Sequence, residues 1–104
     1  MLGNGGSSKA VQYVLEKSGI EHLVVTRNTN SSRQRNLIGY NALDKMVMKE
    51  HLLIIQTTPL GMYPDVFSSP EIPFESIGSK HLLFDLIYNP DETVFLKYGR
   101  DAGA

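Results

Sequence analysis

Two continuous apolar runs constrain the fold of this chain more than any other feature. They read LLIIQT at positions 52–57 and LLFDLI at positions 82–87, and each has the length of one strand. A strand that is apolar at consecutive positions is typical of a parallel sheet with helices on both faces. Two shorter strands are expected at 21–26 and 37–40.

Helical patterns alternate with these strands. The helices are expected at 8–18, at 42–51, in a single turn near 74–77, and at 89–102, with Gly103 beyond the end of the last. Ser7 or Ser8 is the expected cap of the first helix and Gly19 its terminator, Asn41 the cap of the second, and Pro90 a first-turn residue of the last. The alternation predicts an α/β fold with a doubly wound, mainly parallel, Rossmann-like sheet.

The length of 104 residues suits one domain, which we take to span residues 1–104. In a doubly wound sheet the strand before the first glycine turn is central, and here it is reduced to Met1 and Leu2. We therefore expect an incomplete sheet and a fragment of a longer protein. Strand edges left unpaired by such a truncation favour self-association of the chain.

Composition narrows the classes of partner. A net charge of -1 gives no bulk attraction to nucleic acid or to a membrane surface, so neither is expected as a partner. The chain has no cysteine, no membrane-length apolar run and no signal-peptide pattern, which favours a cytoplasmic protein. His22, His51 and His81 lack metal-ligand spacing, so no metal site is predicted. The aromatic residues expected in the core are Tyr13, Phe67, Phe74 and Phe95.

The segment GNGGSSKA (3–10) follows the first strand and opens a helix, which is where Rossmann folds bind a pyrophosphate. Gly3 suits a tight turn and Gly5 a close approach of the backbone to phosphate. Ser8 stands where the third glycine of the G-x-G-x-x-G pattern is usual. An ordinary turn before a helix remains the alternative.

The residues after the second strand indicate the cofactor. Folds that bind NAD usually place a carboxylate there, whereas TRNTNSSRQR (26–35) has three arginines and no acid. Arginine pairs with a 2′-phosphate that an acid would repel, so NADP is favoured over NAD. Arg27 follows the strand directly, while Arg33 and Arg35 are equally well explained as solvated loop charges.

Four segments carry a resemblance to a known family. GNGGSSKAV, VVTRNT, TTPLGMYP and DLIYNPDETVFL resemble, in this order and spacing, the NADP-binding domain of the shikimate dehydrogenases. The resemblance covers essentially the whole chain. It implies that the chain is most of the C-terminal NADP-binding domain of an oxidoreductase of aromatic amino-acid biosynthesis. Such enzymes reversibly reduce 3-dehydroshikimate to shikimate with NADPH.

The resemblance also assigns residues to the cofactor. The glycine turn would hold the pyrophosphate, the residues after the second strand the 2′-phosphate, and the loop after position 56 the nicotinamide ribose. The implied cofactor-binding residues are Gly3, Asn4, Gly5, Gly6, Ser7, Thr26, Arg27, Asn28, Arg33, Thr57, Thr58, Pro59, Leu60, Gly61 and Met62. Tyr88 matches a tyrosine that reaches the substrate, and Gln56 stands where the family usually has asparagine.

No catalytic residue is assigned in this chain. The family's catalytic lysine and aspartate belong to an N-terminal substrate domain, and no segment here matches their motifs. The small-molecule substrate would bind through that absent domain, so the chain alone is expected to have no meaningful turnover. Two alternatives stay open: a quinate/shikimate dehydrogenase paralogue that uses NAD, and a non-catalytic dinucleotide-binding module.

Overall fold

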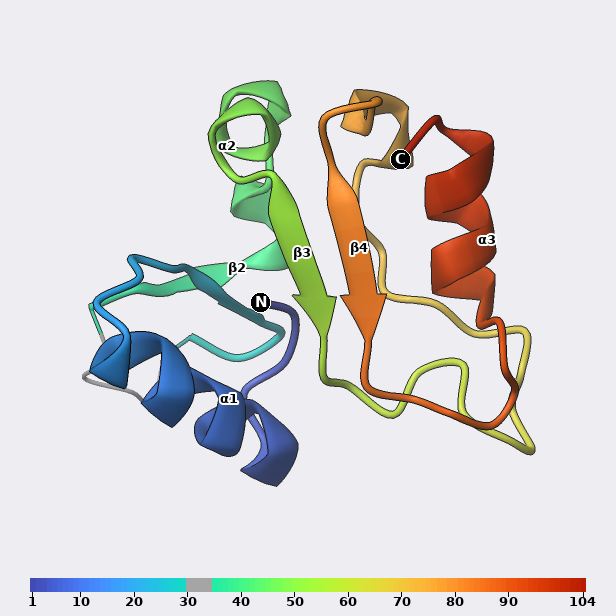
Figure 1. Ribbon diagram of the computed structural model, residues 1–104, viewed down its shortest axis with the longest axis horizontal. Helices are drawn as coiled ribbons and strands as arrows, with labels where there is room; N and C mark the ends of the chain where they lie inside the picture. The colour runs from blue at the N-terminus through green and yellow to red at the C-terminus, as the bar shows by residue number, and fades with distance from the viewer. Residues whose placement is uncertain (30–34) are drawn as a thin grey trace.

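The computed structural model describes residues 1–29 and 35–104 and has the predicted α/β architecture (Figure 1). The strands are β1 (Val24–Thr26), β2 (Leu37–Gly39), β3 (Leu53–Gln56) and β4 (Leu82–Asp85). The helices are α1 (Gly6–Lys17), α2 (Lys45–Glu50) and α3 (Val94–Asp101), with 3-10 turns η1 (Tyr40–Ala42) and η2 (Phe74–Ser76). The helical turn expected near 74–77 is therefore confirmed.

Leu2 joins the strands into one parallel sheet. β1 pairs with β2 and β3 pairs with β4, both in parallel, and Leu2 forms parallel bridges to Val25 and to Gln56. The spatial order is therefore β2–β1–Leu2–β3–β4. From this central position the chain runs outward first to β1 and β2 and then, on the other side, to β3 and β4. This reversal is the topological switch point of a doubly wound sheet, as predicted.

Helix α1 begins earlier than its sequence pattern indicated. Its cap is Gly5 rather than Ser7 or Ser8, and its buried residues are Ser8 and Gln12 rather than the apolar ones. The Ser8 hydroxyl donates a 2.7 Å hydrogen bond to the Gly3 carbonyl, and Gln12 Nε2 donates a 2.9 Å bond to Ser8 Oγ. A small polar face packs here because α1 lies against the backbone of the preceding turn.

The second helix starts later than expected. The predicted cap Asn41 lies within η1, and α2 begins after Asp44, whose side chain accepts a 2.9 Å hydrogen bond from Val47 N–H. An aspartate that satisfies a free amide of the first turn is a strong start signal, and here it prevails over the apolar periodicity that began at Ala42.

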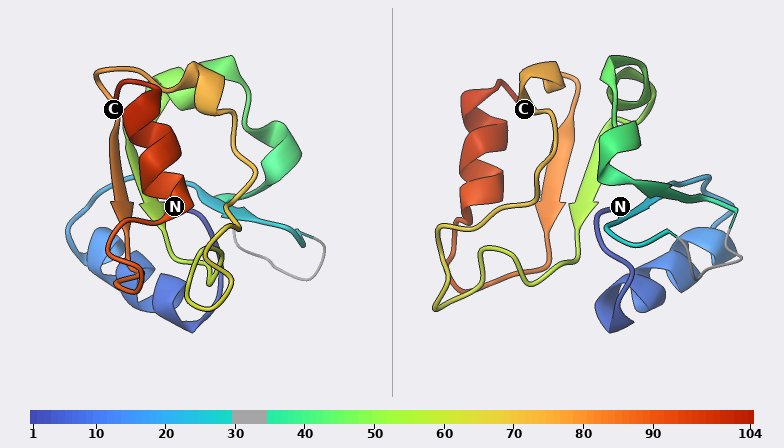
Figure 2. Two further views of the ribbon diagram at one scale, coloured as in Figure 1. Left: turned by 90° about the vertical axis from the view of Figure 1, so that its right-hand side faces the viewer. Right: turned by 180° about the vertical axis from the view of Figure 1, so that it is seen from behind.

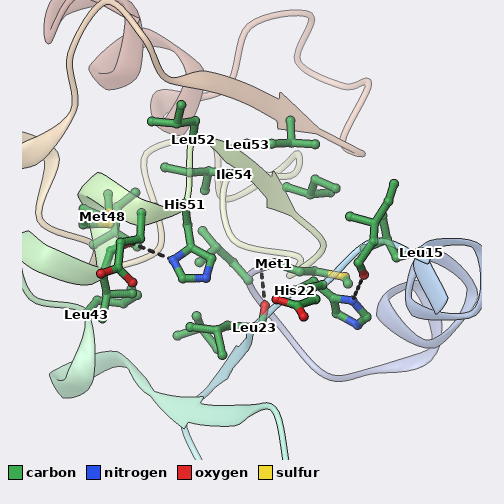
Figure 3. A pocket seen from close by; sticks show the side chains of 18 residues that line it. Met1, Leu15, His22, Leu23, Leu43, Met48, His51, Leu52, Leu53 and Ile54 are labelled. Carbon is green, nitrogen blue, oxygen red and sulfur yellow. Dashed lines mark hydrogen bonds between the residues drawn. The ribbon is translucent and has the colours of Figure 1, made fainter. Parts of the chain in front are cut away.

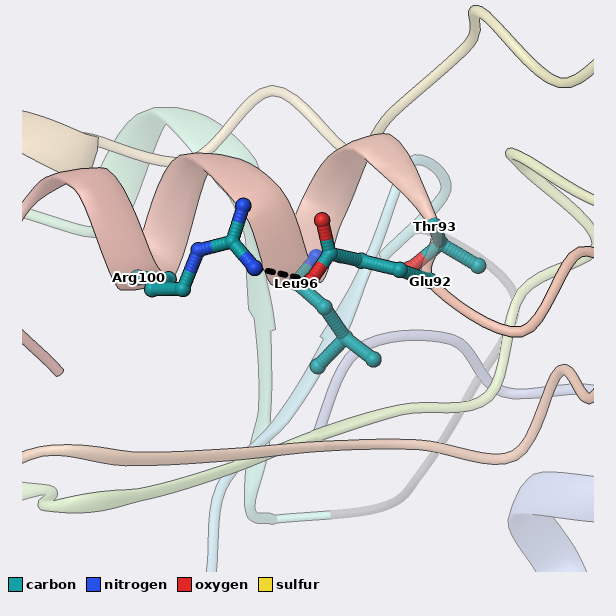
Figure 4. Close-up of polar contacts among 4 residues, drawn as sticks. All are labelled: Glu92, Thr93, Leu96 and Arg100. Carbon is teal, nitrogen blue, oxygen red and sulfur yellow. Dashed lines mark hydrogen bonds and ion pairs between the residues drawn. The ribbon is translucent and has the colours of Figure 1, made fainter.

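The last helix is also shorter than expected. α3 starts at Val94 with Thr93 as its cap, so Pro90 precedes the helix instead of lying in its first turn. Thr93 Oγ1 accepts a 3.3 Å hydrogen bond from Leu96 N–H (Figure 4). Gly19 and Gly103 adopt positive φ beyond the ends of α1 and α3, as expected for helix terminators.

The core lies between the sheet and the helices α2 and α3. Its buried hydrophobic residues are Leu2, Val24, Val25, Met48, Ile54, Ile72, Ile77 and Phe95. Phe74 and Phe95 pack edge to face with ring centroids 6.2 Å apart. The placement of Tyr13 and Phe67 in the core is wrong, because both side chains are exposed. Tyr13 lies on the outer face of α1, beneath Lys17.

One face of the β3–β4 pair is not covered within this chain. Leu83 contacts the backbone of α3 at Gly99, while its neighbours Leu82 and Phe84 point to the other face and are exposed. Leu53, which is paired with Leu82, is exposed on that same face. The expectation that both apolar strands are covered on both faces therefore holds for one face only. Figure 2 shows α3 beside these two strands, with α1 at a distance from them.

Candidate functional site

The predicted site segments meet at one edge of the sheet. Each follows the carboxyl end of a strand: the glycine turn follows Leu2, Thr26 ends β1, Thr57 follows β3, and Leu86 follows β4. Because all pairings are parallel, these ends lie along the same edge, where sheets of this type bind their ligands (Figure 1).

Close packing brings the glycine turn against the loop after β3. Gly3 has φ +102°, and a Cβ added there would lie 2.7 Å from Thr57 Oγ1 and 3.0 Å from Thr58 Cγ2. Thr57 Oγ1 also donates a 2.5 Å hydrogen bond to the Leu2 carbonyl. Gly3 is therefore required both by its backbone conformation and by this approach. Two segments that are far apart in the sequence thus form one wall.

The amino end of α1 is open to an anion. Its cap Gly5 offers no side-chain hydrogen bond, and its first turn contains no acidic residue. No atom lies within 4 Å of where a Cβ on Gly5 or Gly6 would be. Asn4 is held beside the turn, since its Oδ1 accepts a 3.1 Å hydrogen bond from Gln12 Nε2. Free N–H groups and the positive end of the helix dipole suit a phosphate here.

Gln56 organises the loop after β3, although the sequence motifs did not single it out for that role. Its buried side chain accepts hydrogen bonds from Thr58 N–H at 2.8 Å and from the Thr58 hydroxyl at 2.7 Å. Its Nε2 donates to the Thr58 carbonyl at 3.1 Å and to the Leu60 carbonyl at 3.0 Å. A polar residue at the end of an apolar strand is the signal that indicates such a role.

A second contact fixes the far end of this loop. Gly61 N–H donates a 2.8 Å hydrogen bond to Ser68 Oγ. Gly61 has φ +98°, and an added Cβ would lie 3.0 Å from the Ser68 carbonyl oxygen. Pro59 and Met62, also predicted as cofactor-binding residues, are exposed on this loop.

The loops after β3 and β4 are joined to each other. Tyr63 N–H donates a 3.0 Å hydrogen bond to the Asn89 carbonyl. Asp85, at the end of β4, accepts hydrogen bonds from Thr93 Oγ1 at 2.7 Å and from Ile87 N–H at 2.9 Å. Burial raises the pKa of the Asp85 carboxyl, and these two hydrogen bonds oppose the rise. Each carboxylate oxygen of Asp85 thus accepts a hydrogen bond from the segment that follows β4.

Tyr88 and Arg27 extend from this edge into solvent. Tyr88, the predicted substrate-facing residue, is 86% exposed. Arg27 is exposed directly after β1. Burial raises the pKa of the Tyr40 phenol, and the positive charge of nearby Arg27 opposes part of that rise. Asn28 N–H lies 3.4 Å from Thr26 Oγ1, which forms a turn after the strand. Arg33 lies outside the described residues.

Charged pairs and metal clusters are sparse in the described part of the chain. Within residues 1–29 and 35–104, the ion pair recorded joins Arg100 of α3 to Glu92, which precedes that helix, and both side chains are exposed (Figure 4). No group of three metal-ligating side chains is found there. None of the helices in the same ranges combines the length and apolar character needed to span a membrane.

Comparison with known proteins gives a consistent picture. A shikimate dehydrogenase (NADP(+)) from Desulforamulus reducens is 36% identical over 120 aligned residues, which cover 100% of this chain and 40% of that protein. A solved chorismate mutase/shikimate 5-dehydrogenase fusion protein from Clostridium acetobutylicum is 37% identical, with a TM-score of 0.80 over 99% of this chain and 38% of its own.

A solved shikimate dehydrogenase in complex with NADP+ is 26% identical, with a TM-score of 0.75 over 99% of this chain and 40% of its own. No protein-family model matches the chain. The chain spans about two fifths of the length of the relatives it matches. In sequence and in fold, the whole of this chain is therefore related to one Rossmann-like portion of the shikimate dehydrogenases.

Proposed function

We propose that residues 1–104 form the NADP-binding domain of an oxidoreductase of the shikimate dehydrogenase type. The observation that carries the proposal is the juxtaposition of the open amino end of α1 with the loop that Gln56 shapes, at the switch point of the sheet. Relatives named shikimate dehydrogenase (NADP(+)), which match the whole chain, support the same cofactor.

The residues present fit a dinucleotide phosphate. The amide groups at the start of α1 bind the pyrophosphate, and the absence of a side chain on Gly5 leaves room for it. Arg27, an exposed cation after β1, binds the adenosine 2′-phosphate, with Thr26 and Asn28 beside it. Arg33 is proposed as a second cation for this phosphate on its sequence position alone.

The loop after β3 forms the nicotinamide side of the site. Thr57 and Thr58 are held at the carboxyl edge by backbone and Gln56 contacts, so the loop is positioned before any ligand arrives. When bound, NADPH supplies the hydride for reduction of a carbonyl. Tyr88 is exposed beyond β4, where it can reach a substrate held by another domain.

The whole reaction that we propose is the reversible NADPH-dependent reduction of 3-dehydroshikimate to shikimate. The carbonyl carbon accepts the hydride, and its oxygen needs a proton from a positioned acid. We assign no residue of this chain to that proton transfer. We therefore expect the chain alone to bind cofactor and to show no turnover, and a spectrophotometric assay at 340 nm is the measurement.

Calorimetric titration with NADPH and with NADH tests the cofactor assignment. We expect NADPH to bind more tightly, and Arg27→Ala to weaken NADPH binding by about 10-fold to 100-fold, because a charge-assisted hydrogen bond is worth about 1.5–3 kcal/mol. Arg27→Ala leaves the affinity for NADH unchanged. The matched control is Arg100→Ala, which removes the same charge from an exposed position of α3 that is not among the proposed cofactor-binding residues. Equal affinity for both cofactors, unaltered by Arg27→Ala, would contradict the proposal.

A further inference from the structure

The turn before α1 contains a pair of residues with a chemistry of its own. Asn4 is followed by Gly5, and each of the other asparagines of the chain precedes a residue that carries a Cβ. Asparagine is a thermolabile residue, because the next backbone nitrogen can attack its side-chain amide. Glycine at the next position places no Cβ in the way of that attack. Asn4 is therefore the asparagine whose sequence context favours the reaction most.

The structure leaves the attacking group, the backbone nitrogen of Gly5, accessible. Gly5 is exposed, and no atom lies within 4 Å of where its Cβ would be. Within residues 1–29 and 35–104, Gly5 N–H donates no hydrogen bond. Gly5 is also the cap of α1, where the positive end of the helix dipole stabilises negative charge. This nitrogen can therefore lose its proton more easily than one that is bonded within a helix or a sheet.

A series of hydrogen bonds fixes the orientation of the Asn4 amide. The Gly3 carbonyl can only accept, so the single hydroxyl proton of Ser8 serves the 2.7 Å bond to it rather than the weaker acceptor Met1 Sδ at 3.3 Å. Ser8 Oγ then accepts at 2.9 Å from Gln12 Nε2. The same Nε2 donates to Asn4 Oδ1 at 3.1 Å. The nitrogen Nδ2 of Asn4 is therefore turned away from Gln12.

This orientation suits the loss of ammonia from Asn4. A donor held on Oδ1 stabilises the negative charge that this oxygen acquires when a nucleophile adds to the amide carbon. Gln12 is a well-positioned donor, because its side chain is buried and its Nε2 is also bonded to Ser8. In the part of the chain that the structure describes, no hydrogen bond retains Asn4 Nδ2, the nitrogen that must leave. Both ends of the amide are thus arranged for the reaction.

We propose that Asn4 is a site of spontaneous covalent modification, at which its amide is converted to aspartate and isoaspartate. The Gly5 nitrogen gives up its proton to water and forms a bond to Asn4 Cγ. The Cγ–Nδ2 bond then breaks, and Nδ2 takes up a proton and leaves as ammonia. Water opens the resulting succinimide, at Cγ to give aspartate or at the backbone carbonyl carbon to give isoaspartate. The reaction consumes one water and releases one ammonia, and nothing is oxidised or reduced.

The turn cannot accommodate isoaspartate without moving, because the chain on both sides of it is held. Figure 3 shows the amino group of Met1 bonded to the Leu23 carbonyl, a distance of 2.8 Å. Gly3 N–H donates a 2.7 Å hydrogen bond to the Val25 carbonyl, and α1 begins two residues after Asn4. Isoaspartate adds one methylene group to the main chain between these fixed points. The backbone amides at the start of α1 must therefore be displaced.

Both products also place a carboxylate before α1, whose first turn contains no acidic residue. Negative charge there repels the pyrophosphate that we assign to the same amides, and this consequence rests on the proposed function. A bound dinucleotide, in turn, covers Gly5 and slows the attack. The modification is therefore a time-dependent loss of cofactor binding that the cofactor itself delays.

Peptide mapping by mass spectrometry tests the proposal on the intact chain. The protein is kept at pH 8 and 37 °C for several weeks, and trypsin then releases Asn4 within residues 1–9. We expect Asn4 to be converted to both products about tenfold faster, or more, than Asn41, an exposed asparagine that precedes alanine. Conversion of Asn4 no faster than that of Asn41 would overturn the proposal.

One variant separates the contribution of the fold from that of the sequence. Gln12→Met removes the donor to Oδ1 and keeps the pair Asn4–Gly5, so conversion should slow by about threefold or more. The matched control is Val14→Met, which adds the same side chain at an exposed position of α1 and should leave the rate unchanged. An unaltered rate in folded Gln12→Met would overturn the structural basis of the proposal. If circular dichroism shows that Gln12→Met does not fold, the comparison of Asn4 with Asn41 decides alone.

Saturating NADPH distinguishes the modification site from its consequence. We expect bound NADPH to slow the conversion of Asn4, and the converted chain to bind NADPH about tenfold more weakly, or worse, by calorimetry. Conversion of Asn4 that NADPH does not slow, with unchanged affinity afterwards, would contradict the proposed cofactor site and still support the modification site. Absence of conversion in a chain that binds NADPH would overturn the modification site alone.

Discussion

The side chain of Gln56 accepts hydrogen bonds from both the backbone N–H and the hydroxyl of Thr58, at 2.8 and 2.7 Å. With its amide it also donates to the carbonyls of Thr58 and Leu60, so its oxygen and nitrogen are both engaged although it is fully buried. One strand-end residue thereby shapes the loop that we propose to contact the nicotinamide ribose.

Replacing Gln56 should therefore lower the stability of the folded chain. Gln56→Ala leaves buried groups of Thr58 and Leu60 without partners, and we expect the free energy of unfolding to fall by about 3 kcal/mol. Urea denaturation followed by circular dichroism measures it. Asn41→Ala, at an exposed polar position, is the control and should change stability little. A loss for Gln56→Ala no larger than that of the control would show that the network contributes nothing.

Gly3 is expected to tolerate no side chain. Gly3→Ala combines a left-handed backbone with a Cβ 2.7 Å from Thr57 Oγ1, so we expect a loss of about 2 kcal/mol or more in the free energy of unfolding. The matched control is Gly78→Ala, where no atom lies within 4 Å of the added Cβ. Comparison of the two urea midpoints is the test, and equal midpoints would refute the close approach.

Thr93 links β4 to α3 through its hydroxyl. Thr93→Val keeps the shape but removes the cap of Leu96 N–H and the hydrogen bond to Asp85, so we expect a loss of about 1–2 kcal/mol. Thr93→Ser keeps the hydroxyl and should recover most of that stability. If serine were as destabilising as valine in thermal unfolding, the methyl group rather than the hydrogen bonds would be responsible.

The amino group of Met1 should make stability depend on pH. Its pKa is lowered from 8.0 to about 6 in the folded chain, so the unfolded chain binds more protons between these values. The destabilisation that burial of the ammonium causes is complete below pH 6 and disappears as the pH rises through 8, a change of about 3 kcal/mol. The free energy of unfolding should therefore rise with pH over this window.

Acetylation of the amino group isolates this contribution from that of the histidines. Urea denaturation of the free and the N-acetylated chain at pH 6, 7 and 8 should give a steeper rise for the free chain. Parallel pH profiles for the two forms would show that burial of the ammonium is not coupled to folding.

Local patterns predicted the element types but placed several boundaries wrongly. The apolar runs at 52–57 and 82–87 became β3 and β4, because strand formation there depends on consecutive apolar residues. Helix starts were less predictable, since Asp44 and Thr93 cap helices only through contacts with specific amides. Apolar periodicity does not depend on such contacts, so the starts that it predicted for both helices were too early.

The candidate site, too, could be predicted from the sequence only in part. The glycine turn and the segment TTPLGM were recognisable as strand-end segments, because parallel sheets bind ligands at that edge. The packing of Gly3 against Thr57 and the network around Gln56 depend on side chains meeting across the fold, and no spacing rule contains them.

By itself, the sequence determined that the chain is an α/β protein with a parallel sheet and a glycine turn at its centre, because apolar periodicity and turn residues act locally. Only the tertiary structure decided that Leu2 holds the two halves of the sheet together and that the loop after β3 packs against Gly3. Hydrogen bonds between strands distant in the chain create both features, and such pairings are set by the completed fold rather than by neighbouring residues.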